Sequence, residues 1–399
     1  MAGIRGGEGR FGEELSARER FNRTMHYQHV DYVSHLEFGY WDELKEEWME
    51  QGHLPTSLQE PDDSIPNRAV EEYFGVEQFE SFDARIGALP EHPREVVERT
   101  EDTIVYRDEL GVLKQEQLNR TRTIPHFLEF PIHDLASWEG FRNEFLDVDH
   151  PARVIPEEEL RAKEEMSRQS ENPVSTNFGS FIGWVRDWTG FEGLAYMSKD
   201  DPDLLEEMVE HLSNMLLELL PPVLMRGQFD AAGGWEDICF NSGPILSPDF
   251  FAERIMPHIK PVMRMLRQYG IDVIWTDCDG NILDLIPLWL DVGLNCMFPL
   301  EVNPGNDPLA LKQEYGRDLL IRGGFDKFAL HEGREAVLQE LLRLEPVVAE
   351  GGFIPHIDHR CPGEVSFDTY CYYTWEKCHM LGWPEHKIKS FPALRKWKP

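Results

Sequence analysis

The stretch that decides the fold is Trp275–Asn281, Trp-Thr-Asp-Cys-Asp-Gly-Asn, because it joins a strand pattern to a helix pattern through acidic residues. The apolar run Ile271–Ile274 precedes it and a helical pattern from Ile282 follows, which predicts strand, polar loop and helix. Carboxylates such as Asp277 and Asp279 are costly beside an apolar interior unless they are paired or bind a metal. Similar strand ends recur at Gly234-Trp-Glu-Asp237, Phe298-Pro-Leu-Glu301, Gly323-Gly-Phe-Asp-Lys327 and Pro355-His-Ile-Asp-His359. The series predicts one rim where a reaction is assembled.

The same alternation along the chain predicts an α/β fold with a parallel sheet. The expected strands are Val33–Gly39, Phe82–Leu89, Val174–Phe181, Ala231–Cys239, Ile271–Asp277, Cys296–Val302, Leu319–Phe325 and Phe353–Asp358. Eight such units favour a single (β/α)8 TIM-type barrel over an open doubly wound sheet. No Gly-x-Gly-x-x-Gly or Walker motif supports the open alternative.

We expect one domain over residues 1–399, with an early insertion at 100–170. Thr103–Arg107 and Val112–Gln115 predict a β-hairpin in it. Two charged helices should follow, at Leu135–Phe145 and Glu157–Met166. Other helix starts are signalled by a capping box at Ser16-Ala-Arg-Glu19 and by Asp201-Pro202 and Ser247-Pro248, and a helix is expected over Asp42–Gln51. Residues 1–14 are Gly- and Glu-rich and are expected to be frayed.

Composition excludes several classes of function. The formal net charge of −34 over 399 residues argues against nucleic acid or an anionic membrane as partner, because both need a basic surface. The six cysteines show no close metal-type pair and are expected to be reduced thiols. The N-terminus lacks the apolar core of a signal peptide, and no run approaches the roughly 18 apolar residues of a membrane helix. These features predict a soluble, cytoplasmic protein.

The motifs together resemble the uroporphyrinogen decarboxylase superfamily, which includes that decarboxylase and methyltransferases that work with corrinoid proteins. The resemblance covers most of the chain. It is carried by Arg18-Glu-Arg-Phe21, Val30-Asp31-Tyr-Val33, Phe178-Gly-Ser-Phe-Ile-Gly183, Gly243-Pro-Ile-Leu-Ser-Pro248, Asp277-Cys-Asp-Gly-Asn281, Pro299-Leu-Glu301, Tyr315-Gly316, Gly323-Gly-Phe-Asp326 and Gly351-Gly-Phe-Ile354. It implies a barrel with its active site at the carboxyl ends of the strands.

Two departures from the family pattern bear on function. The decarboxylase carries an arginine-rich segment after its first strand, whereas Leu36–Asp42 contains no arginine, and its acids would repel a highly carboxylated substrate. The thiol-methylating branch carries His-x-Cys-Gly and a later Cys as zinc ligands. The matching places here hold Asp277, Asp279 and His359. Carboxylates and an imidazole leave zinc a stronger Lewis acid than thiolates do, which suits polarising a substrate oxygen.

These substitutions predict a metal site, most simply zinc, bound by Asp277, Glu301 and His359, since three acids without a cation would repel one another. Asp279 or Glu236 would then be the fourth ligand or general acid. The alternative for each acid is a helix cap or a salt bridge, and for the pair at 236–237 one inward acid and one cap, with Glu236 favoured inward. Substrate contacts are expected from Tyr40, Trp41, Phe178 and His356, although aromatic residues are more often core.

The resulting hypothesis is a methyltransferase component that demethylates a small methoxylated or methylated compound and passes the methyl group to a corrinoid protein. One alternative is a cofactor-free decarboxylase on a less acidic substrate, with Asp279 or Glu236 as proton donor. Another is a non-catalytic barrel subunit, against which the unpaired acids argue. The expected partners are a small-molecule methyl donor and a corrinoid protein, and a homodimer is left open.

Overall fold

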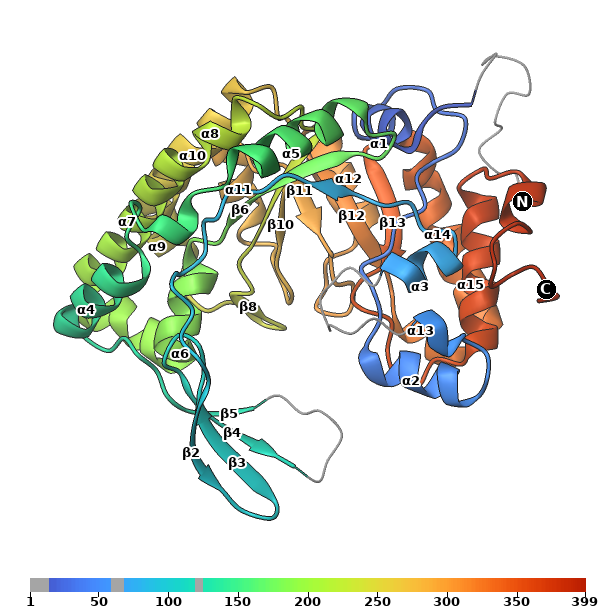
Figure 1. Cartoon of the computed structure of the whole chain (residues 1–399). Coiled ribbons are helices and arrows are strands. Elements are labelled where there is room, and N and C mark those ends of the chain that lie inside the picture. The colour runs from blue at the N-terminus through green and yellow to red at the C-terminus, as the bar shows by residue number, and fades with distance from the viewer. Residues whose placement is uncertain (1–13, 59–67, 119–124) are drawn as a thin grey trace.

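The computed structural model describes residues 14–58, 68–118 and 125–399. Its centre is a curled seven-stranded sheet in which all neighbouring strands are parallel (Figure 1). In spatial order these are β1 (Glu80–Ser81), β6 (Val174–Gly179), β7 (Ala231–Trp235), β10 (Ile274–Asp277), β11 (Cys296–Phe298), β12 (Leu320–Phe325) and β13 (Phe353–Ile357). Spatial order follows chain order, as in a barrel built of βα units. The α/β class and the parallel sheet are confirmed.

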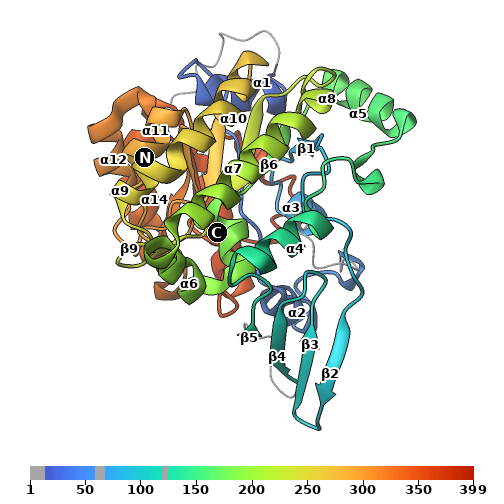
Figure 2. The same ribbon diagram turned by 90° about the vertical axis from the view of Figure 1, so that its left-hand side faces the viewer.

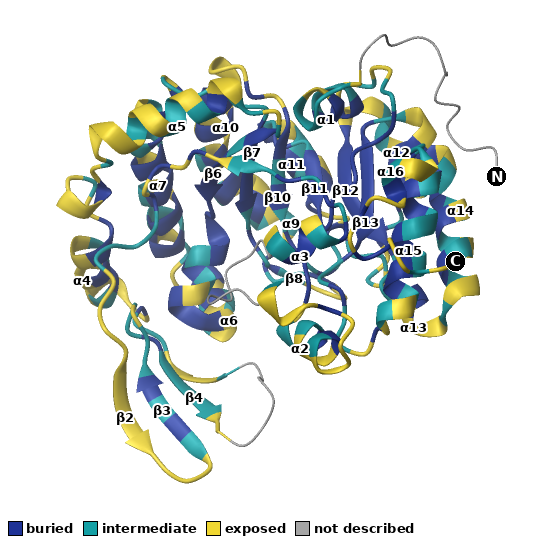
Figure 3. Ribbon diagram, turned by 45° about the vertical axis from the view of Figure 1, so that its right-hand side comes forward, coloured by how far each residue is buried: buried dark blue, intermediate teal, exposed yellow. Residues whose placement is uncertain are grey.

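Helices cover the outer face of the sheet (Figure 2). Before the sheet's first strand lie α1 (Ala17–Met25), α2 (Asp42–Glu50) and α3 (Arg68–Tyr73). The later helices are α6 (Ile182–Asp200), α7 (Pro202–Leu219), α8 (Pro221–Leu224), α9 (Pro248–Phe250), α10 (Met256–Gln268), α11 (Ile286–Val292), α12 (Pro308–Tyr315), α13 (Phe328–Glu332), α14 (Arg334–Glu350), α15 (Phe367–Met380) and α16 (Glu385–Ile388). Figure 3 shows the central strands buried and the outward helix faces exposed.

The predicted helix starts are confirmed by their caps. The Ser16 hydroxyl accepts a hydrogen bond from the Glu19 amide at 3.2 Å, which satisfies one free donor of α1. The Asp201 and Ser247 side chains cap α7 and α9 in the same way, each followed by proline at the first helical position. Helix α6 was not predicted, since its glycines lower helix propensity and Gly190 inside it has a left-handed φ of 75°.

The prediction of a first strand at Val33–Gly39 is wrong. The segment nevertheless crosses the gap between the two edges of the sheet. The His35 carbonyl accepts from the Glu77 amide at 2.8 Å, just before β1, and the Gly39 carbonyl accepts from the Cys361 amide at 3.0 Å, just after β13. Tyr40 and Cys361 form one parallel bridge. The described strands therefore form a curled seven-stranded sheet, and an eighth strand that would close the ring is not formed among them.

The second predicted strand, Phe82–Leu89, is also displaced, because β1 ends at Ser81. The Phe82 amide still donates to the Ser175 carbonyl at 3.0 Å. The next bond is made by a side chain, since the Asn177 amide donates to Asp83 Oδ1 at 2.8 Å. The carboxylate thus takes the place of a ladder carbonyl, and the chain leaves the sheet there.

The insertion begins earlier than predicted, at β2 (Glu95–Arg99). The expected hairpin is confirmed as β3 (Thr103–Arg107) and β4 (Leu113–Gln117), which pair antiparallel. With β2 and β5 (His126–Glu129) they form a four-stranded sheet that projects from the body of the fold (Figures 1 and 2). The two charged helices follow as α4 (Leu135–Phe145) and α5 (Glu157–Gln169).

One buried apolar cluster runs from α1 to the residues after α16. The single-domain assignment stays a prediction. Residues 1–13 of the segment expected to be frayed lie outside the described residues. Within the described ranges, no helix has both the length and the apolar character needed to cross a bilayer.

A pH-dependent contact joins α1 to the segment before β10. His26 Nε2 lies 3.0 Å from Asp272 Oδ2, and this hydrogen bond raises the pKa of His26 to about 9 against the opposing effect of burial. Because the folded pKa exceeds the unfolded value of about 6.5, the stabilisation is present below pH 6.5 and is lost as pH rises through 9.

We expect His26→Gln to remove this part of the pH dependence of the free energy of unfolding. The pair is partly exposed, so the effect should be within about 0.2–1 kcal/mol. Urea unfolding at pH 6 and at pH 10 measures it, and Asp272→Asn should give the same result. An unchanged difference between the two pH values in both variants would contradict the assignment.

Candidate active site

Three acids meet at the carboxyl ends of two neighbouring strands. Asp237 follows β7, while Asp277 ends β10 and Asp279 lies just beyond it. One carboxylate oxygen from each lies within 4.8 Å of the others, and all three residues are half-buried. The strands bring them together because Trp235 of β7 pairs with Asp277 in the ladder. This is the end of the sheet where barrel enzymes carry their active sites.

Backbone hydrogen bonds fix the two loops that carry the acids. The Glu236 amide donates to the Asp277 carbonyl at 2.7 Å, and the Asn281 amide donates to the Phe240 carbonyl at 2.9 Å. Asp237 Oδ1 accepts from the Asp279 amide at 3.3 Å. Asp237 also adopts a left-handed φ of 46°, a strained conformation that is concentrated at functional sites.

The electrostatics of the cluster favour a proton or a cation. Burial raises the pKa of Asp277 well above its ordinary value, and the charges of Asp237 and Asp279 raise it further. Arg322 and Arg360 oppose this rise only in part. Burial, followed by the charge of Asp279, also raises the pKa of Asp237. Asp279 Oδ1 is buried without a hydrogen-bond partner. A divalent cation would relieve both the repulsion and the unpaired oxygen.

Glu301 lies outside the cluster of acids that the structure brings together. Its Oε1 accepts from Lys327 Nζ at 2.5 Å and its Oε2 accepts from the Gly280 amide at 2.8 Å. The metal-type cluster contains Asp237 in place of Glu301.

His359 lies beside the cluster, as its predicted role requires. Its Nε2 is 3.3 Å from Asp279 Oδ2. The ring stacks on Trp41 with centroids 5.6 Å apart and meets the edge of Phe38 at 5.7 Å. Cys278, between the two acids of β10, is buried, and burial raises the pKa of its thiol well above its ordinary value. Its thiol is thus part of the core beside the acids.

Glu236 points away from the acids into the start of α6. Its carboxylate accepts from the amides of Phe181, Ile182 and Gly183 at 3.1, 2.8 and 2.9 Å and from the Ser180 hydroxyl at 3.0 Å. An acid that satisfies the free amides of a helix N-terminus has a structural role. The expected order of the pair is thus reversed: Glu236 caps α6 and Asp237 is the inward acid.

The four residues expected to contact substrate divide into two groups. Tyr40 and Phe178 are each 1% exposed and lie in the packed core, where Tyr40 accepts a hydrogen bond from the Tyr370 hydroxyl at 3.0 Å. Both side chains are thus part of the core, and a contact with substrate stays a prediction for them. Trp41 is 42% exposed and stacks on His359. His356 is buried, with its Nε2 lacking a hydrogen-bond partner.

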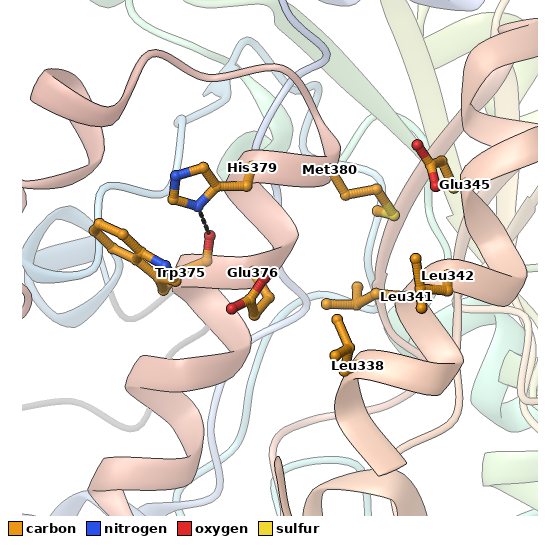
Figure 4. Close-up of a pocket in the computed structure, with 8 residues that line it drawn as sticks. All are labelled: Leu338, Leu341, Leu342, Glu345, Trp375, Glu376, His379 and Met380. Atoms are coloured by element: carbon orange, nitrogen blue, oxygen red, sulfur yellow. Dashed lines mark hydrogen bonds between the residues drawn. The ribbon is translucent and has the colours of Figure 1, made fainter. Parts of the chain in front are cut away.

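A cleft of about 660 Å³ opens at the carboxyl ends of β1 and its neighbouring strands, and none of the three clustered acids lines it. It is lined by the segment 83–91 that leaves β1 and by the carboxyl ends of the next strands, including Asn177, Gly179 and Trp235. Trp235 precedes the inward Asp237 by two positions. A second cavity, of about 350 Å³, is an apolar groove between the outer helices α14 and α15 and contains none of the clustered acids (Figure 4).

The fold and site define a barrel-like α/β protein with a carboxylate cluster at the carboxyl ends of its strands. Among solved structures it is similar to a methyltransferase from Methanosarcina mazei, with a TM-score of 0.55 and 12% identity over 92% of this chain and 98% of that one. At this identity the similarity shows a shared fold alone. The YdjI aldolase from Escherichia coli K12 matches with a TM-score of 0.23 and 10% identity over 60% of this chain and 83% of that one. A match at this score does not indicate a shared fold. No family model and no curated protein matches the sequence.

Proposed function

We propose that the protein is a methyltransferase component that removes a methyl group from a small methoxylated or methylated compound and passes it to a corrinoid protein. The observation that carries this proposal is the convergence of Asp237, Asp277 and Asp279 in a methyltransferase-like fold. The sequence resemblance to the uroporphyrinogen decarboxylase superfamily supports the corrinoid partner and the demethylating direction.

The residues present fit a divalent cation, and we propose zinc. Three carboxylates offer hard oxygen ligands, the unpartnered Asp279 Oδ1 is one of them, and the imidazole of His359 lies next to it. A cation held there would supply Lewis acidity toward an ether oxygen or amine of the methyl donor.

The protein's own residues would bind and orient the donor. The cleft beside Trp235 is large enough for a small molecule. Phe38 and Trp41 pack on two sides of His359 and limit the access of water to its ring. Arg360 lies over Trp41 at 5.0 Å and is attracted to Asp277 and Asp279, so it neutralises part of the acid charge.

One observation favours the decarboxylase alternative. Burial and the charges of two neighbouring acids raise the pKa of Asp277, which favours its protonated form, and a carboxylic acid of this kind can protonate a product carbon. This reaction would need neither a metal nor a corrinoid.

The two functions are separated by one assay. Purified protein is mixed with a reduced corrinoid protein and a panel of methoxyaromatic compounds and methylamines, and the Co(I) absorbance is followed. We expect the Co(I) absorbance to fall with at least one donor. This loss should stop after zinc is chelated and return when zinc is restored. It should be slower with the matched ethoxy compound. Release of CO2 from a carboxylic acid substrate without any corrinoid would overturn the methyltransferase proposal.

A further inference from the structure

An arginine with an unmet hydrogen-bonding capacity lies inside the sheet, next to the carboxylate cluster. Arg322 stands in the middle of the apolar strand β12 and is 7% exposed. Its Nε has no hydrogen-bond partner. A guanidinium carries five N–H donors, and a buried one without partners is costly unless a ligand or water accepts from it.

Aromatic rings hold this guanidinium in place. Its central carbon lies 5.2, 4.8 and 4.6 Å from the ring centroids of Phe79, Trp275 and Phe298. The Trp275 indole lies over its ladder partner Gly233, where an added Cβ would lie 2.4 Å from the ring. Aromatic faces attract the cation but accept no strong hydrogen bond, so they orient Arg322 without satisfying its donors.

Arg322 also lies close to the acids. Trp275 and Asp277 share one face of β10, since strand side chains alternate. Arg322 is near enough to Asp277 to lower the pKa of that carboxyl group in part, but no ion pair joins them in the described part of the chain. Burial lowers the pKa of Arg322 to about 10, so the guanidinium stays charged at neutral pH. The unpartnered Nε2 of His356 belongs to the next strand, β13.

An anion would satisfy the guanidinium donors of Arg322. Three carboxylates, one divalent cation and Arg322 together carry no formal net charge, and Arg360 is attracted first to Asp42. A neutral methyl donor would leave the guanidinium donors unmatched. A donor bearing one carboxylate would satisfy them, because a carboxylate accepts two parallel hydrogen bonds from arginine.

We propose that Arg322 is a specificity-determining residue that binds the carboxylate of the substrate, so that the methyl donor is a small carboxylic acid. The proposal rests on the proposed active site but not on the corrinoid step. It assigns Arg322 to ground-state recognition.

Calorimetric binding of two probes, 4-methoxybenzoate and 4-methoxybenzamide, tests it without any corrinoid protein. The probes share shape and differ in charge. We expect the parent to bind the benzoate at least tenfold more tightly than the amide, a difference of about 1.4 kcal/mol. Arg322→Met should abolish that preference and leave amide binding unchanged, and Arg322→Lys should retain part of it.

Two controls make the result decisive. Measurements on chelated and zinc-restored protein distinguish binding by Arg322 from direct binding to the metal, because only the former gives a preference that survives chelation. Arg254→Met, which breaks an ion pair with Asp203 and Glu206 on the outer helices, should keep the preference for the benzoate, and thermal unfolding checks that each variant is folded. Equal binding of both probes, no binding of the benzoate, or a preference unchanged in folded Arg322→Met would overturn the proposal. Failure of methyl transfer in the separate Co(I) assay would leave this result unaffected.

Discussion

Replacing Lys377 by methionine is expected to lower the free energy of unfolding by about 3–5 kcal/mol, because it leaves Glu37 as an unpaired carboxylate in the core. Lys377 Nζ lies 2.6 Å from Glu37 Oε1 and 2.6 Å from the Leu36 carbonyl. The two side chains are 0% and 2% exposed. The Tyr373 hydroxyl donates to the same Glu37 oxygen at 2.9 Å.

This buried pair anchors the segment that crosses the gap in the sheet. Glu37 Oε2 accepts from the Ile357 amide of β13 at 3.4 Å, and burial raises the pKa of Glu37 in spite of Lys377. A loss of about 3–5 kcal/mol is a large part of the stability of an ordinary domain. Loosening this segment would also move Phe38 and Trp41, which pack on His359.

Urea unfolding of three variants measures the effect. Lys377→Met should be strongly destabilised, and the double variant Glu37→Gln, Lys377→Met should recover most of the loss, because it no longer buries a charge. The exposed pair of Lys389 with Glu385 provides the matched control, and Lys389→Met should leave stability nearly unchanged. Equal stability of Lys377→Met and the parent would show that the pair does not hold the segment.

Most of the sheet could be predicted because its strands are apolar runs that end in polar residues. The six strands of the central sheet from β6 to β13 were found in this way. The ends of β10 and β12 agree with the prediction, and those of the other four were placed one to four residues too late. The crossing segment at 33–39 was predicted to be a strand because its apolar pattern resembles one. Its position is instead fixed by the long-range ion pair of Glu37 with Lys377. A pair separated by 340 residues leaves no local signal.

The placements in the site that differ from expectation have separate physical causes. Glu236 was expected inward because α6 was not predicted, and without that helix there were no free amides for its carboxylate to satisfy. The left-handed φ of Asp237 could not be read from its residue type. The alternation of side chains along a strand could have indicated Asp237, because Trp235 and Asp237 are two positions apart and would share one face. Arg322 was overlooked although a charged residue within an apolar strand is itself unusual.

Exchanging Asp277 for asparagine is expected to reduce bound zinc from about one equivalent to little and to slow methyl transfer by about 10²-fold or more. Asp277 lies at the centre of the cluster, where burial and both neighbouring acids raise its pKa, so its carboxylate gains most from a cation. Asp237→Asn should also lose zinc and activity, because Asp237 belongs to the cluster of acids and Glu301, expected there from the sequence, does not.

The matched control is Glu301→Gln, which should keep its zinc because Glu301 is already bound to Lys327 and the Gly280 amide. His359→Ala decides whether the imidazole is a ligand: loss of zinc would place it in the coordination set, and retention would limit it to a partner of Asp279. Metal analysis of each folded variant is the measurement. If the parent were metal-free but active, and Asp277→Asn inactive, the carboxyl group would be acting by proton transfer. The decarboxylase alternative would then be the better explanation, because burial and two neighbouring negative charges favour the protonated form of Asp277.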